Sequence, residues 1–174
     1  MIISWYHLGY TCTVQSITIE SDHDRSITKV TGTHANGKCN DDVLLLHSDG
    51  KKFNYFPHDI KLFFKNLNKI AIMLSNIATI SKEDLKPFGS QLKSVYFQSN
   101  KIEAIEADLF EFTPNLEVIN LNNNKIKYVG NGAFSNLNKL KALSVTGNSC
   151  ISGEASDQSV IQLIPQIESQ CKNL

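Results

Sequence analysis

A spacing that recurs every 24 or 25 residues constrains the fold of this 174-residue chain more than any other feature. Four segments begin at Leu67, Leu92, Leu116 and Leu140, at intervals of 25, 24 and 24 residues. Each segment has apolar residues at its first, fourth and sixth places. These residues are Leu67, Ile70 and Ile72; Leu92, Val95 and Phe97; Leu116, Ile119 and Leu121; and Leu140, Leu143 and Val145. A fixed period of this length predicts a stack of similar units that share one continuous core.

Each segment also predicts a short strand. In the third segment, LEVINLNNNKI, the apolar residues Ile119 and Leu121 are expected to point inward, whereas Asn120 and Asn122 alternate to the solvent face. The ninth place is polar in every copy, as Ser75, Asn100, Asn124 or Asn148. Further apolar pairs follow in three copies, at Ile77 and Ile80, Ile102 and Ile105, and Ile126 and Val129.

This pattern resembles the leucine-rich repeat, L-x-x-L-x-L-x-x-N-x-L, from Leu67 to Cys150. The resemblance implies an α/β repeat solenoid, a horseshoe with short parallel strands on its concave face. It also implies that Asn100, Asn124 and Asn148 form a structural ladder, because an amide can both donate to and accept from the backbone of adjacent turns. The shorter side chain of Ser75 is expected to weaken that ladder at its copy.

The flanking segments predict two caps on one continuous domain. Alternating apolar residues around SDHD predict a β-hairpin in the N-terminal cap, residues 1–42. The repeats are expected over 43–149, with one irregular unit at 43–66, and the C-terminal cap over 150–174. In that cap Val160, Ile161, Ile164 and Ile167 have helical spacing, and Pro165 is expected to kink or end the helix.

Four cysteines lie in two pairs, Cys12 and Cys39 before the repeats, Cys150 and Cys171 after them. Three pairings are formally possible. Strands about 4.8 Å apart would separate the two ends by roughly 20 Å, and a disulfide needs Cα atoms within roughly 7 Å. We therefore expect the structural bridges Cys12–Cys39 and Cys150–Cys171, which require an oxidising compartment. Buried free thiols in a cytosolic protein are the alternative.

Cysteine-bearing caps and a 24-residue period resemble the extracellular subtype of the family, and GYTC, VTGTH, FPHDI and FFKNL resemble small secreted insect proteins of this class. The resemblance implies a secreted protein. The opening MIISWYHLGY lacks the basic start, long apolar middle and cleavage site of a signal peptide. We therefore expect either a removed leader or, alternatively, an intracellular chain.

Composition argues against several classes of function. Lys plus Arg and Asp plus Glu both number 17, so no excess positive charge attracts nucleic acid or anionic membrane. No apolar run approaches the roughly 20 residues of a membrane span. The five histidines form no HExxH motif, and no Gly-rich phosphate loop occurs. A metal site from His34, Cys39 and His47 is the weakest alternative, and we expect no enzyme, cofactor or metal.

Binding remains, and in the family it usually uses the outward residues of the concave sheet. The expected partner-binding residues are Met73, Tyr96, Gln98, Asn120, Asn122, Ser144 and Thr146. Tyr96 is the foremost candidate, because interface hot spots favour Trp, Tyr and Arg. The function expected is a monomeric, secreted recognition module for an extracellular protein. The alternatives are a secreted structural or self-associating protein without a dedicated ligand, and a cytosolic scaffold.

Overall fold

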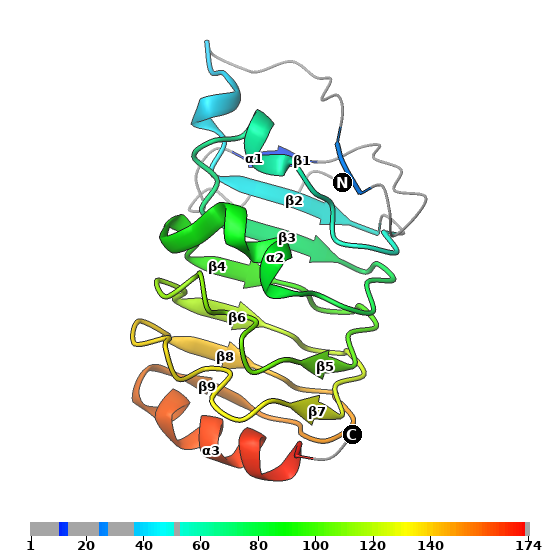
Figure 1. The fold of residues 1–174 in the computed structure, drawn as a ribbon, viewed down its shortest axis with the longest axis vertical. Coiled ribbons are helices and arrows are strands. Elements are labelled where there is room, and N and C mark those ends of the chain that lie inside the picture. Colours follow the sequence, from blue (N-terminus) through cyan, green and yellow to red (C-terminus); the bar gives the residue numbers. More distant parts are fainter. Residues whose placement is uncertain (1–10, 14–24, 28–36, 51–52, 173–174) are drawn as a thin grey trace.

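The computed structural model describes residues 11–13, 25–27, 37–50 and 53–172, and its strands follow one another as rungs of a single stack (Figure 1). The sheet strands are β1 Thr11–Thr13, β2 Leu45–Asp49, β3 Lys69–Met73, β4 Ser94–Tyr96, β6 Val118–Asn120, β8 Ala142–Ser144 and β9 Glu154–Ser156. A second sheet pairs β5 Ala104–Ile105 with β7 Tyr128–Val129. The helical elements are η1 Asn40–Asp42, α1 Ile60–Phe63, α2 Lys82–Leu85, η2 Lys86–Gln91, η3 Asp157–Ser159 and α3 Val160–Gln170.

The main sheet has the order β1-β2-β3-β4-β6-β8-β9 and is parallel up to β8. Its register repeats the sequence period. Leu45 pairs with Lys69, Lys69 with Ser94, and Ser94 with Val118. Residues at the same place of successive repeats therefore lie side by side across the sheet. This arrangement is the solenoid that the repeats predict.

The core lies between the two sheets and follows the apolar places of the repeat. Leu67, Ile70 and Ile72 are completely buried, and the corresponding residues of later copies are buried too, apart from the half-buried Leu140. The returning chain contributes the apolar pairs that end at β5 and β7, and these are buried as well. Removal of this continuous apolar surface from water is the main driving force for the stack.

The irregular first unit keeps the same period. Val43, Leu46 and Ser48 precede Leu67, Ile70 and Ile72 by 24 residues each, and all three are buried. Phe53 and Phe56 follow β2 on the returning chain and are buried. The Phe56 ring packs edge-on against Phe88 and Phe97, with ring centroids 6.4 and 6.1 Å apart. Large aromatic rings therefore fill this end of the core.

The Asn column makes the hydrogen bonds that a ladder requires. Asn124 Oδ1 accepts from the Ile102 amide (3.1 Å), and its Nδ2 donates to the carbonyls of Phe97 and Leu121 (2.9 and 3.0 Å). Asn100 and Asn148 make equivalent bonds one unit earlier and one unit later. Each side chain therefore joins its own turn to the preceding one. Ser75 donates to the Met73 carbonyl (3.2 Å), two residues back in the same turn.

The C-terminal cap closes the stack by two devices. Strand β9 pairs antiparallel with β8, and α3 packs against the end of the core through Val160, Leu163 and Ile167. The expected Cys150–Cys171 disulfide is formed, with Cα atoms 5.2 Å apart. Of the kink or end expected at Pro165, the end is wrong, because α3 continues to Gln170, with Pro165 on its exposed side. Buried residues before and after the proline, Leu163 and Ile167, pack on the core and stabilise the helix on both sides of it.

The N-terminal cap differs from expectation at Cys39. This residue is an exposed free thiol, so the expected Cys12–Cys39 bridge is not formed. Cys39 is instead the N-cap residue of η1, where its N–H donates to Asp42 Oδ2 (2.9 Å). The backbone of Cys12 lies opposite Leu46 in β1, parallel to β2.

The predicted hairpin falls mostly on residues outside the described ones. The part that is described comprises β1 and a bridge from Ser26 to His58. The division of the chain at 42/43 and 149/150 stays a prediction. Among the described helices none is long and apolar enough to cross a bilayer.

Candidate functional site

The concave face of the sheet is built from two rows of side chains that alternate with the core residues. The fifth-place row contains His47, Ala71, Tyr96, Asn120 and Ser144, which are register partners from β2 to β8. The seventh-place row contains Asp49, Met73, Gln98, Asn122 and Thr146. All seven residues predicted for binding lie in these rows. Met73, Tyr96, Gln98, Asn120 and Asn122 are half-buried, Ser144 is buried and Thr146 is exposed.

The C-terminal half of this face forms a closed polar network. Asn122 Oδ1 accepts from both Ser144 Oγ and the Thr146 amide, at 2.7 Å each. Asn120 Oδ1 accepts from the Asn122 amide at 3.0 Å. These side chains therefore use much of their hydrogen-bonding capacity within the protein.

The N-terminal half is different. Gln98 Nε2 points at the thioether sulfur of Met73 (2.6 Å), a weak acceptor. Gln98 Oε1 is buried and, in the described part of the chain, has no hydrogen-bond partner. Such an unpaired acceptor costs about 1–3 kcal/mol. Tyr96 is half-buried in the neighbouring row, between its register partners Ala71 and Asn120.

A turn with positive φ ends each concave strand at the eighth place. The residues there are Gly50, Leu74, Ser99, Asn123 and Gly147, with φ between 51° and 73°. The first four amides donate to the seventh-place carbonyl of the next unit, as from Leu74 to Gln98 (3.2 Å) and from Ser99 to Asn122 (2.8 Å). The amide of Gly147, in the last repeat, donates to Ser152 Oγ (3.2 Å). A left-handed conformation costs most residues about 1–2 kcal/mol, and Gly and Asn tolerate it best. Leu74 is therefore the exception in this column, and 58% of it is exposed.

Charges near the concave face lie on its rim. At the second place, Lys141 Nζ binds Glu117 Oε2 at 2.8 Å, and Lys93 approaches the other carboxylate oxygen at 4.0 Å. The hydrogen bond from Lys141, together with the charge of that lysine, lowers the pKa of Glu117. This pair is exposed to water, so its contribution to stability is small.

Three further residues lie on the concave face besides those expected to bind a partner. Strand β2 brings His47 and Asp49 into the two rows, and β9 adds Glu154 opposite Ser144. The signal for β2 was present, because Val43 lies one period before Leu67. For β9 the sequence carried no such signal, because this strand runs against the repeat.

A buried carboxylate forms the other polar centre, away from the concave rows. Asp84 forms a capping box with Ser81 at the start of α2 and is only 4% exposed. Its Oδ1 binds His58 Nε2 (2.8 Å) and Arg25 Nη1 (3.1 Å). Ser81 donates to Asp84 Oδ2 from both its amide and its hydroxyl (2.7 and 3.0 Å).

This centre joins distant parts of the chain. The His58 amide donates to the Arg25 carbonyl (2.8 Å), so residues 25–27 are attached to the first repeat units. A cavity of about 160 Å³ beside it is lined by His58, Lys61, Glu83, Asp84 and Phe88, among others. Ser81 and His58 both bind the carboxylate and not one another. The trio therefore lacks the nucleophile-to-base contact of covalent catalysis.

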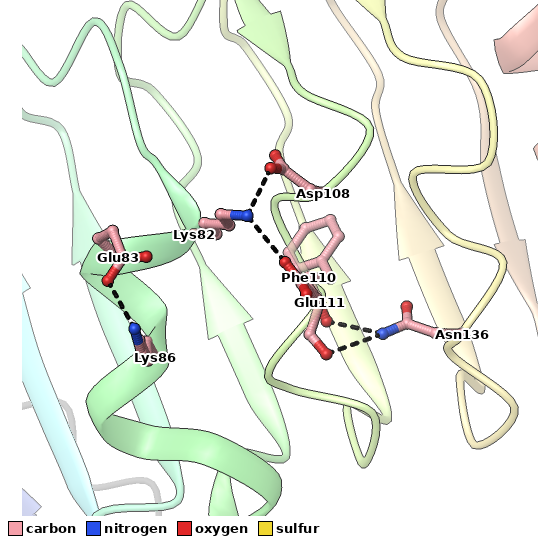
Figure 2. A network of polar contacts seen from close by, with 7 residues as sticks. All are labelled: Lys82, Glu83, Lys86, Asp108, Phe110, Glu111 and Asn136. Atoms are coloured by element: carbon pink, nitrogen blue, oxygen red, sulfur yellow. Dashed lines mark hydrogen bonds and ion pairs between the residues drawn. The ribbon is translucent and has the colours of Figure 1, made fainter.

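Figure 2 shows a surface network that ties three successive units together on the side that carries α2. Lys82 Nζ lies 2.9 Å from both Asp108 Oδ2 and Glu111 Oε2. Hydrogen bonds to Glu111 and then Asp108 raise the pKa of Lys82. Asn136 Nδ2 in turn donates to the Phe110 carbonyl at 2.9 Å. The contacts brace neighbouring units and leave the concave face untouched.

Comparison with known sequences finds relatives over part of the chain. The family model described as "Leucine rich repeat" matches residues 90–149. Mouse podocan is 40% identical over 75 residues, which are 42% of this chain and 12% of podocan. Mouse Toll-like receptor 9 is 29% identical over 93 residues, 52% of this chain and 9% of the receptor. The chain thus spans a small fraction of the length of these relatives.

Solved structures give the same result for the fold. The alignment with the APL1 leucine-rich-repeat domain covers 81% of this chain and 34% of the APL1 chain, with a TM-score of 0.57 and 17% identity. Toll in the Drosophila Toll–Spatzle complex covers 63% of this chain and 15% of its own, with a TM-score of 0.57 and 20% identity. The matching chain of the TLR13–ssRNA13 complex has a TM-score of 0.56 and 26% identity. The alignment covers 62% of this chain and 15% of the matching chain.

Proposed function

We propose that this chain, which is a leucine-rich-repeat protein, is a non-enzymatic recognition module that binds another protein on its concave sheet. The observation that carries the proposal is the composition of the two concave rows. They combine half-buried, mostly uncharged polar side chains with Tyr96 and Met73, and their charges lie at the margins. Such a surface suits protein recognition, where charged residues are depleted at the centre of an interface.

The comparisons support this type of partner. The Toll structure, which shares the fold, was solved in a complex with the protein Spatzle. The TLR13 structure was solved with single-stranded RNA. This chain carries equal numbers of basic and acidic residues, 17 of each, so it has no net positive charge to attract a polynucleotide. We therefore favour a protein partner.

An extracellular location belongs to the same proposal. The Cys150–Cys171 bridge ties α3 to the last repeat, and such bridges persist in oxidising compartments. Peptide mapping of the protein from its native source tests this part of the proposal. An intact Cys150–Cys171 bridge is the expected result, and two free thiols at these positions would place the protein in a reducing compartment.

Site-specific photo-crosslinking tests the binding face. A benzophenone amino acid replaces Tyr96 on the concave face or, as a matched control, Phe112 on the opposite side, both of which are half-buried aromatic residues. Each protein is irradiated in extracellular fluid of the source organism, and covalent products are identified by mass spectrometry. We expect one dominant protein adduct from position 96 that is absent from position 112.

The identified partner is then produced and titrated against Tyr96→Ala and Asn120→Ala. A loss of about tenfold or more in affinity for Tyr96→Ala is expected for a central aromatic contact. Adducts from position 112 alone, or none from position 96, would overturn the concave-face assignment. An adduct with a second copy of this chain would support self-association instead.

A further inference from the structure

We propose that Leu74, with Met73 and Gln98 beside it, is the specificity-determining contact of the concave face and takes an apolar side chain from a segment of the partner without acidic residues. This inference rests on the proposed function, because it names the part of the concave face that selects the partner. It is drawn from a residue that the fold itself does not favour.

The backbone position of Leu74 is set by the solenoid and not by the leucine. Its amide donates to the Gln98 carbonyl, just as Gly50 donates to Met73 and Asn123 to Thr146. All of these residues have φ near +60°, a conformation in which a Cβ is unfavourable. The other members of the column are two glycines, an asparagine and a serine, which are small or suited to this conformation. A leucine is therefore the least suitable residue that the column contains.

Burial of the side chain does not compensate for this conformation. Leu74 is 58% exposed, and of the described large hydrophobic residues only Leu62 and Ile161 are also so exposed. Leu62 and Ile161 lie in α1 and α3, in ordinary helical backbone. Leu74 alone of the three combines a left-handed backbone with an exposed apolar side chain. Folding and solubility both disfavour it, and contact with a partner is the remaining role for it.

The surroundings of Leu74 specify the chemistry of what binds there. Met73 and Gln98 are half-buried and uncharged, and among the described residues Gln98 Oε1 has no hydrogen-bond donor. Met73 is unbranched and flexible, so its side chain can move aside and let a backbone N–H of the partner reach that oxygen. The exposed Asp49 is the register partner of Met73, whereas Lys69 lies at the opposite end of β3. Because a carboxylate repels a second acidic group, an apolar side chain without acidic neighbours fits this spot.

The first arm of the test measures the conformational cost. Leu74→Gly should raise Tm by about 3 °C, because it relieves the left-handed leucine and removes little packing. Ser99→Gly is the matched control in the same column, and a smaller change is expected there. A fall of several degrees for Leu74→Gly would mean that Leu74 is a packing residue, and this result would overturn the inference.

The second arm uses a random 12-residue peptide library displayed on phage, so it does not require the natural partner. Peptides are selected on the wild-type protein and measured against Leu74→Asn, with Ser99→Asn as control, since Asn123 is native at the same place. We expect selected peptides to share an apolar residue and to lose about tenfold or more in affinity for Leu74→Asn. Less than a twofold change is expected for Ser99→Asn.

The possible failures can be told apart. Peptides that lose affinity for Tyr96→Ala and not for Leu74→Asn would overturn the role of Leu74 and leave concave-face binding intact. Peptides with acidic consensus residues would contradict the proposed chemistry. If neither variant affects the selected peptides, or if selection yields no enrichment, both the inference and the proposed binding face fail.

Discussion

The two halves of the concave sheet share one register but differ in how their side chains are used. At the seventh place, Asn122 accepts two hydrogen bonds of 2.7 Å from the next unit, whereas Gln98 carries a buried oxygen without a partner. At the eighth place, the same turn holds Asn123 in one half and the exposed Leu74 in the other. The regular half satisfies its own polar groups. The irregular half retains unused binding capacity, and recognition is expected there.

The same contrast extends into the core. The sixth place is apolar in the four later units but is Ser48 in β2, where the hydroxyl is buried without a hydrogen-bond partner among the described residues. The ninth place is Asn in the last three units and Ser75 in the first of the four. Stability should therefore depend most on the C-terminal units, and four experiments test this difference between the two halves.

Asn124→Ala should have the largest effect. The change leaves the Ile102 amide and the Phe97 and Leu121 carbonyls without their side-chain partner, inside a buried layer. We expect a loss of about 3 to 4 kcal/mol in the free energy of unfolding, measured by urea denaturation. Ser75→Ala is the control at the same place, with an expected loss below about 1 kcal/mol. Equal losses would show that the two halves of the ladder are equivalent.

Removal of the Cys150–Cys171 bridge should cause the second-largest loss in the free energy of unfolding. The bridge closes a loop with a sequence separation of 21 residues. In the chain-entropy model such a loop is worth about 3 kcal/mol. The double variant Cys150→Ser/Cys171→Ser should lose about this amount, seen as an earlier urea midpoint. Cys39→Ser, at the exposed free thiol of the other cap, should change the midpoint little. A comparable loss there would contradict the asymmetry of the caps.

Replacement by alanine of two buried serines, Ser48 and Ser144, should change the stability of the protein in opposite directions. Ser48→Ala removes a hydroxyl that is buried without a partner, and should stabilise the protein by about 1 kcal/mol. Ser144→Ala removes the donor to Asn122 Oδ1 and should destabilise it by about 1 kcal/mol. Thermal unfolding of both variants measures the difference. If both changes destabilise equally, the polar network of the C-terminal half has no special role.

Glu117 should give the smallest effect, and that effect should depend on pH. Its pKa in the folded protein is lowered below the ordinary value of 4.5, mainly by the hydrogen bond from Lys141. The stabilisation is therefore present above pH 4.5 and is lost as pH falls through the lowered folded pKa. Glu117→Gln should lower Tm by about 1 °C at pH 7. The difference from wild type should vanish at acid pH. A difference that persists unchanged there would exclude the ion pair as its cause.

Much of the fold followed from local spacing. The columns headed by Leu67, Ile70 and Ile72 recur at one period, and inward and outward positions alternate along each strand. The core, the parallel rungs, the Asn hydrogen bonds and the concave location of Tyr96 and Asn122 could therefore be predicted.

Features that depend on contacts across the stack could not be predicted in this way. Asp84 lies in a charged turn in the sequence, yet it is buried because Arg25 and His58 come from other segments to bind it. Cys39 caps η1 and remains a free thiol, although an even cysteine count favoured a bridge.

The spacing of residues along the chain specifies the repeat, its core and the concave face, because each of these depends on which residues recur at a fixed interval. Which half of that face keeps its hydrogen-bonding groups unused depends on contacts between units in three dimensions. Which hydrogen-bond partners the side chains of Asn122 and Gln98 find depends on distances of a few ångströms between neighbouring units. Those distances are set by how successive turns stack, and spacing along the chain does not specify them.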